Sequence, residues 1–209
     1  MRVPLAEYDD AYFGHGDKPP KANYRCYGPP PWAPLVALLI KTWGLGPVLD
    51  VGGAFGYLTA ALRGVGVQAF NLDCSQFAYD NRACAHFIHD DALTMSKVPD
   101  NFYQTIVSMD LLEHFEPDDT EKVMDSMIRV ARTGAVMFHL VGFPRPDLGD
   151  QDNHYDDPTH LNHEPLQWYI DRFEERGWTI YHKPMQEFNK AFQGTDWSGR
   201  WIALAEVSR

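Results

Sequence analysis

The chain has 209 residues, of which 44% are apolar and 13% aromatic, and its formal net charge is −11. This length and apolar content fit one α/β domain over residues 1–209, and the negative charge argues against nucleic acid or an anionic membrane as partners. The three cysteines, Cys26, Cys74 and Cys84, are an odd number without metal-like spacing, which favours a reducing compartment over a disulfide scaffold. Because there is no apolar signal segment and the longest apolar run, Leu35 to Ile40, is too short to span a bilayer, we expect a soluble cytoplasmic protein.

Residues 1–31 form a leader in which aromatic side chains are spread among prolines and glycines that prevent long regular elements. Its aromatic residues include Tyr8, Tyr12, Phe13, Tyr24 and Tyr27. Because so many aromatic rings in a polar segment need apolar surface to cover, we predict an arm that lies over the mouth of a pocket. A tail packed loosely on the surface is the alternative.

The clearest local pattern begins after a predicted helix over residues 32–43, which the sequence Gly44 to Pro47 ends. A short apolar strand, Val48 to Val51, runs into Gly52, Gly53 and Gly56, and a helix is predicted from Tyr57 to Arg63. Glycines let a ligand approach the backbone closely, and the following helix N-terminus offers unpaired N–H groups, so this turn is typical of a nucleotide site. An ordinary strand-to-helix turn is the alternative.

A second predicted strand, Val67 to Asp73, ends in a carboxylate 17 residues after Gly56. This is about where an α/β nucleotide fold places an acid against a ribose diol. The alternative role for Asp73, capping the next helix, is better served by Ser75.

The rest of the chain alternates strands and helices, which predicts a mostly parallel sheet with its acids at the carboxyl edge. Predicted strands cover residues 85–89, 103–109, 135–141, 178–182 and 201–207, and predicted helices cover 117–132 and 164–176. His139, in the fifth strand, is predicted to be an interior histidine rather than a ligand.

Four motifs in order carry a family resemblance: Leu49 to Gly56, Asn71 to Ser75, Asp91-Ala92, and Ser108 to His114. Together they resemble class I S-adenosylmethionine (SAM)-dependent methyltransferases, most closely the branch that methylates small molecules and sugars. The resemblance covers about residues 45 to 207 and implies a Rossmann-like, doubly wound seven-stranded sheet with helices on both faces and the last strand antiparallel.

The resemblance also implies where SAM would lie across the carboxyl ends of the strands. Asp50, Gly52, Gly53 and Gly56 would shape the methionine-side loop, and Asp73 with Cys74 would hold the ribose. Asp91 and Ala92 would meet the adenine, and Ser108, Met109 and Asp110 would line the sulfonium side. The family's middle glycine is Ala54 here, and its methyl group is tolerated if the residue has a negative φ.

The least ordinary segment lies in residues 142–163, an acidic, histidine-rich loop predicted on the acceptor side. Within residues 147–163 it holds three histidines and five aspartates, ending in Asp157-Pro158-Thr159-His160, an element similar to one beside the acceptor in related methyltransferases. Its histidines suit acid/base work. His160 is the first candidate for the base, and His114, from the fourth motif, and His163 are the next candidates. A divalent-metal site formed by His154, Asp157, His160 and His163, or a merely solvated loop, are the alternatives.

The predicted function is therefore transfer of a methyl group from SAM to an oxygen, or less favourably a nitrogen, of a small-molecule acceptor such as a sugar or natural-product intermediate. Three alternatives stay open: a nicotinamide-dependent oxidoreductase, a metal-binding or metal-assisted protein, and a SAM-binding partner subunit without activity. The sequence leaves the acceptor unnamed and a homodimer open.

Overall fold

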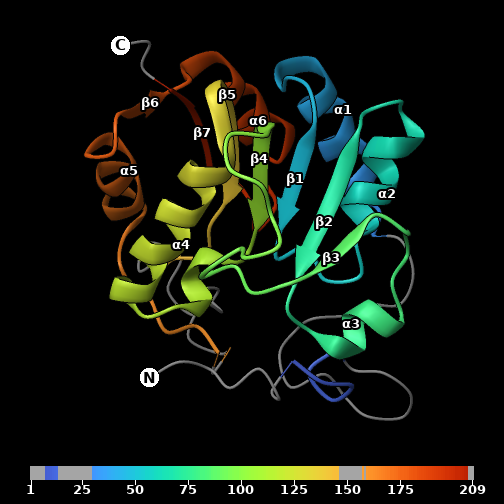
Figure 1. The fold of residues 1–209 in the computed structure, drawn as a ribbon. Coiled ribbons are helices and arrows are strands. Elements are labelled where there is room, and N and C mark those ends of the chain that lie inside the picture. Colours follow the sequence, from blue (N-terminus) through green and yellow to red (C-terminus); the bar gives the residue numbers. More distant parts are fainter. Residues whose placement is uncertain (1–7, 14–29, 146–156, 158, 207–209) are drawn as a thin grey trace.

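The computed structural model describes residues 8–13, 30–145, 157 and 159–206. A seven-stranded sheet in the order β3-β2-β1-β4-β5-β7-β6 forms its centre (Figure 1). The strands are β1 (Val48–Val51), β2 (Ala69–Asp73), β3 (Phe87–His89), β4 (Tyr103–Met109), β5 (Ala131–Leu140), β6 (Trp178–Ile180) and β7 (Trp201–Glu206).

The first five strands of the chain pair in parallel, whereas β7 runs antiparallel to both β5 and β6. Parallel neighbours need crossover helices, so both faces of the sheet are covered; β1 is buried along its whole length, and β5 is buried from Ala135 to Leu140. The predicted Rossmann-like sheet with an antiparallel last strand is thus confirmed.

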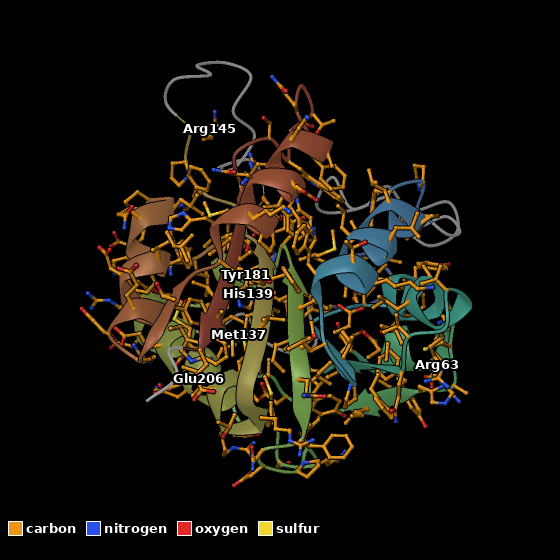
Figure 2. The ribbon with its side chains drawn as sticks, turned by 90° about the horizontal axis from the view of Figure 1, so that it is seen from above. Arg63, Met137, His139, Arg145, Tyr181 and Glu206 are labelled. Carbon is orange, nitrogen blue, oxygen red and sulfur yellow. The ribbon has the colours of Figure 1, made fainter. Side chains whose placement is uncertain are left out.

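Helices pack on both faces of the sheet. They are α1 (Ala33–Trp43), α2 (Tyr57–Gly64), α3 (Gln76–Asp80), α4 (Pro117–Val130), α5 (Leu166–Glu174) and α6 (His182–Ala191), with a short 3-10 turn, η2, at Leu112–His114. One core cluster joins α4 and α5 to one face of the sheet, and a second joins α1, α2 and α6 to the other. Residues alternate between these faces along β5, the strand on which Figure 2 labels Met137 and His139. These two residues share one face, and Phe138 lies in the core cluster on the other.

Several predicted boundaries were wrong by a few residues, two of them with a clear cause, and one helix was missed. The helix predicted over residues 117–132 ends at Val130, because the chain enters β5 at Ala131, with a register shift and a positive-φ Gly134 before the regular pairing begins. The strand predicted over residues 178–182 stops at Ile180, and α6 then begins at His182, a helix that we did not predict. Its sequence holds few apolar residues and has Pro184 in the first turn, so no apolar run marks this helix, although Phe188 and, just beyond its end, Phe192 anchor it in the core.

The carboxyl edge of the sheet carries α3 and the turn formed by residues 8–13 (Figure 1). In that turn Asp9 caps the backbone, its Oδ1 accepting from the N–H groups of Ala11 and Tyr12 at 2.9 and 3.0 Å. Tyr12 and Phe13 are buried in a third cluster with Phe55 and Ala78. The rest of the predicted arm, apart from residues 30 and 31, lies outside the described residues.

None of the helices in the described part of the chain is both long and apolar enough to cross a membrane.

Candidate active site

The turn after β1 requires glycine for two different reasons. Gly56, the N-cap of α2, has φ +76°, in the left-handed region that suits glycine. Gly53 has no special φ, but a Cβ on it would lie 2.1 Å from Oδ1 of Asn71 and 2.5 Å from Oδ2 of Asp50. The turn therefore closes over two buried polar side chains, and only glycine fits there.

Asp50 and Asn71 form a buried polar pair beneath this turn. Asn71 donates from Nδ2 to the carbonyl of Ala54 at 2.9 Å, and its Oδ1 meets no donor among the described residues. Burial raises the pKa of Asp50 to about 7, against a hydrogen bond from Thr59. Asp50 thus supports the loop from below and does not line the cavity described next.

Asp73 lies at the tip of β2 with both carboxylate oxygens aligned by backbone donors. Its Oδ2 accepts from the N–H of Ala54 at 2.9 Å and its Oδ1 from the N–H of Ser75 at 2.8 Å. Burial raises the pKa of Asp73, and these backbone hydrogen bonds oppose the rise. Each oxygen keeps a second lone pair, so the carboxylate can still accept hydrogen bonds from a ligand's hydroxyl groups.

Ala54 does not have the negative φ at which its methyl group was expected to be tolerated. Its φ is +47°, so its methyl group is held in the left-handed region and not at a negative φ. The side chain is buried against Phe13 and Phe55 in the third cluster. The turn keeps its shape despite this strained residue, because Asn71 and Asp73 bind its carbonyl and its N–H.

A cavity opens at this edge of the sheet, and its empty volume of about 780 Å³ includes space that is open to solvent. Its lining consists of Tyr8, Tyr12, Phe13, Gly52, Ala54, Leu72, Asp73, Cys74, Asp91, Ala92, Met109, Asp110, Leu111, His114 and Phe115. Eight of the predicted site residues are thereby brought together: Gly52, Asp73, Cys74, Asp91, Ala92, Met109, Asp110 and His114. Six others lie outside the lining: Asp50, Gly53, Gly56, Ser108, His160 and His163.

Ser108 does not occupy the position expected for it. It is fully buried in β4, with its hydroxyl 2.8 Å from Nδ1 of His139 on β5. His139 stacks on Phe173, with ring centroids 5.0 Å apart, and burial lowers its pKa to about 3. The pair therefore belongs to the interior between the sheet and α5.

Asp110 and Glu113 form a carboxyl pair at the end of β4. Burial raises the pKa of Asp110 to about 6, and the charge of Arg200 together with a hydrogen bond from Glu113 opposes the rise. Burial and the charge of Asp110 raise the pKa of Glu113 well above its usual range. Glu113 accepts at Oε1 from the N–H of Gly142 at 2.7 Å, whereas its Oε2 meets no hydrogen-bond partner among the described residues.

His114 connects the cavity to the acceptor-side segment. Its Nδ1 lies 2.9 Å from Oγ1 of Thr159, and its ring meets that of His160 edge to face at 4.8 Å. Burial lowers the pKa of His114 to about 4, helped by the charge of His160 and opposed by Asp157 and by the backbone of Thr159 and Asp110. His114 is therefore neutral near pH 7 and able to accept a proton.

The metal alternative gains no support. The described residues contain no group of three or more histidine, cysteine, aspartate or glutamate side chains that could hold a metal ion. His154 lies outside the described residues, and Asp157 and His160 approach each other only to 3.7 Å.

Three apolar residues of the lining, Leu72, Leu111 and Phe115, were not predicted as site residues. Leu111 and Phe115 flank the Glu113-His114 pair, and Leu72 precedes Asp73. Apolar residues beside each polar motif are the signal that could have found them, although the same signal marks ordinary core positions.

The polar groups that line the cavity fit SAM. Asp73 and Asp91 lie in one cavity with the positive-φ Gly52, and the tight packing over Gly53 keeps the turn flat against the sheet edge. The cavity continues past Met109 and Asp110 to His114. A nucleoside end, a sulfonium end and an acceptor end can thus be accommodated in one continuous space.

Comparison with known proteins gives the family. Residues 24–183 match the family described as a methyltransferase domain, and the chain belongs to that family. Its fold is that of class I SAM-dependent methyltransferases. This membership favours the methyltransferase over the nicotinamide-dependent alternative, and a search of curated proteins finds no match.

Several solved structures share the fold at low identity. A SAM-dependent methyltransferase from Archaeoglobus fulgidus is 14% identical, with a TM-score of 0.62 over 84% of this chain and 94% of that one. A protein described with the conversion of a disulfide bond into a thioacetal group in echinomycin biosynthesis is 20% identical, with a TM-score of 0.66 over 97% and 92%. A chain of the complex between the Haloferax volcanii Trm112 methyltransferase activator and a methyltransferase is 14% identical, with a TM-score of 0.65 over 85% and 90%.

Proposed function

We propose that this protein transfers the methyl group of SAM to an oxygen of a small, largely apolar acceptor. The observation that carries the proposal is the single cavity that joins Asp73 and Asp91 to His114 through Met109 and Asp110. The echinomycin-related neighbour, which is described with a natural product, supports a small-molecule acceptor. The aromatic and aliphatic lining around His114 suits an acceptor with a flat or apolar body.

The residues divide the work along the cavity. Asp73 would hold the ribose hydroxyls, Asp91 and Ala92 the adenine, and Gly52 the methionine-side backbone. When bound, SAM would supply an electrophilic methyl group: a bond forms between the acceptor oxygen and the methyl carbon, the C–S bond breaks, and its electron pair stays on the sulfur of the departing thioether. The protein contributes mainly alignment of donor and acceptor, which can account for several orders of magnitude in rate.

His114, rather than His160, is the proposed proton acceptor, because His114 lines the cavity and His160 lies behind it. An alcohol that gains a methyl group becomes strongly acidic, so even an imidazole with a pKa of about 4 can take its proton. The proton passes from the acceptor oxygen to His114, and the oxygen keeps the new C–O bond.

The test is calorimetric titration with SAM, followed by assay of S-adenosylhomocysteine release with a panel of small phenols and alcohols. We expect micromolar SAM binding by the wild type and by Asp80→Ala, an exposed control with the same charge change, and at least tenfold weaker binding by Asp73→Ala. With any active acceptor, His114→Asn should lower kcat about 100-fold while SAM affinity stays unchanged. Unchanged SAM affinity in Asp73→Ala would contradict the site assignment.

A further inference from the structure

Nδ1 of His114 faces the hydroxyl of Thr159, and that hydroxyl donates its proton to another acceptor. Oγ1 of Thr159 lies 2.9 Å from Nδ1 of His114 and 2.6 Å from Oδ1 of Asp157, to which it donates. A hydroxyl has only one proton, so toward His114 the oxygen acts as an acceptor. The hydrogen of that contact must then belong to Nδ1.

The direction of this chain of hydrogen bonds is set by the backbone. Oδ1 of Asp157 also accepts from the N–H of Thr159, at 2.8 Å, which fixes that oxygen as an acceptor. The hydroxyl of Tyr12, a buried residue of the turn formed by residues 8–13, is also hydrogen-bonded to the Thr159 side chain. Thr159 is itself buried, so water has little access to its hydroxyl.

The loop that carries Thr159 is itself attached to the His114 turn. The N–H groups of Leu161 and Asn162 both donate to the carbonyl of Glu113, at 2.8 and 3.0 Å. Asn162 also donates from Nδ2 to the hydroxyl of Thr120 at 3.1 Å. These bonds hold Thr159 and His114 in a fixed relation.

We propose that Thr159 and Asp157 are positioning residues that hold His114 as its Nδ1–H tautomer, which leaves Nε2 as the nitrogen that takes the proton in the cavity. The purpose of this arrangement rests on the proposed function, but the tautomer is a property of the protein without an acceptor. When Nε2 takes a proton, no bond in the network breaks, and the carboxylate of Asp157 stabilises the resulting imidazolium through Thr159. The ring of His160 abuts that of His114, and a positive charge on His160 lowers the pKa of His114.

The test is two-bond ¹H–¹⁵N correlation spectroscopy of protein with ¹⁵N-labelled histidine at neutral pH, with His114→Asn to assign the resonances. We expect the Nδ1–H form of His114 in the wild type. Asp157→Ala frees the Thr159 hydroxyl to donate to Nδ1, so the Nε2–H form should become the major one. Asp157→Asn keeps an acceptor oxygen at Oδ1 and should keep the Nδ1–H form.

Thr159→Val and Thr159→Ser provide a second, independent pair. The valine removes the acceptor and should lose the Nδ1–H preference, whereas the serine should restore it. A wild type in the Nε2–H form, or unchanged tautomers in both Asp157→Ala and Thr159→Val with native melting temperatures, would overturn the proposal. Failure of the wild type to bind SAM would instead contradict the proposed function and leave the tautomer result standing.

Discussion

Gly53 and Ala54 are neighbours in the same turn, yet the structure constrains them in opposite ways. Gly53 has an ordinary backbone conformation but no space for a Cβ, whereas Ala54 has space for its methyl group but a φ of +47°. An L-residue in the left-handed region costs about 1–2 kcal/mol, which the burial of a methyl group offsets by about 0.8 kcal/mol. The departure at Ala54 is thus a modest cost in stability, and the turn that faces the cavity is retained.

The buried carboxyl of Asp50 makes a pH-dependent contribution to stability whose sign can be derived. Its pKa is about 7 in the folded state, above the ordinary value of 3.8, so the folded state holds the proton more tightly. For a carboxyl shifted in this direction, stability is present at low pH and is lost as the pH rises from about 4 through about 7. The charge of Asp73 is one of the causes of this raised pKa, after burial.

Asp50→Asn should therefore stabilise the protein most above neutrality, less at pH 5, and little below about pH 4. Asparagine cannot ionise, its carbonyl can accept from Thr59, and its amide can donate to Oδ1 of Asn71, which lacks a donor. We expect the melting temperature to rise by on the order of 5 °C at pH 8. Equal shifts at pH 5 and pH 8 would contradict the pKa argument, and Asp80→Asn serves as the exposed control.

At the scale of elements, what could be predicted depended on how strongly each pattern repeats. The strand–turn–helix around Gly52 and Gly56, and the acids at strand ends, follow from local chemistry that needs no tertiary information. The position of Ser108 and the existence of α6 do not, because the former depends on which face of β4 meets α5 and the latter on two aromatic anchors. Which of the candidate histidines lines the cavity likewise depends on how residues 159–162 pack against η2.

Ser75 connects α3 to the turn of residues 8–13, although it lies 67 residues after Tyr8 in the sequence. Its Oγ accepts from the N–H of Ala78, which caps α3, and donates to the carbonyl of Tyr8 at 2.6 Å. One hydroxyl therefore both begins a helix and attaches the turn of residues 8–13 to the edge where Asp73 lies.

Ser75→Ala should lower the free energy of unfolding by about 1 kcal/mol and release that turn. Ser75→Asp can still cap α3 but has no proton to donate to Tyr8, so it should release the turn with less loss of stability. Chymotrypsin cleavage after Tyr8, Tyr12 and Phe13, followed by mass spectrometry, measures the release, and Ser75→Thr is the control that keeps both bonds. Equal cleavage in Ser75→Ala and Ser75→Thr would show that the turn is attached by its aromatic contacts alone.

At the scale of the whole molecule, stability is concentrated in the middle of the sheet and function at one edge of it. The strands β1, β4 and β5 are paired on both sides and covered by both core clusters, whereas β3 and β6 are three-residue strands at the two ends. The cavity opens where the turn of residues 8–13, the glycine turn and η2 meet, and none of β6 contributes to its lining.

Hydrogen exchange should reflect this division, because amides exchange through local openings whose free energy follows burial and pairing. Without ligand, we expect β4 and β5 to exchange slowest and β3 and β6 far faster. Saturating SAM should slow exchange in residues 8–13, 52–56 and 73–75, because a ligand held at the carboxyl edge stabilises only conformations in which those segments are closed. It should leave β6 almost unchanged, since β6 lies at the far end of the sheet from β3. NAD in a parallel sample is the control, and protection of β6 equal to that of residues 8–13 would mean that SAM stabilises the fold globally, without closing this edge.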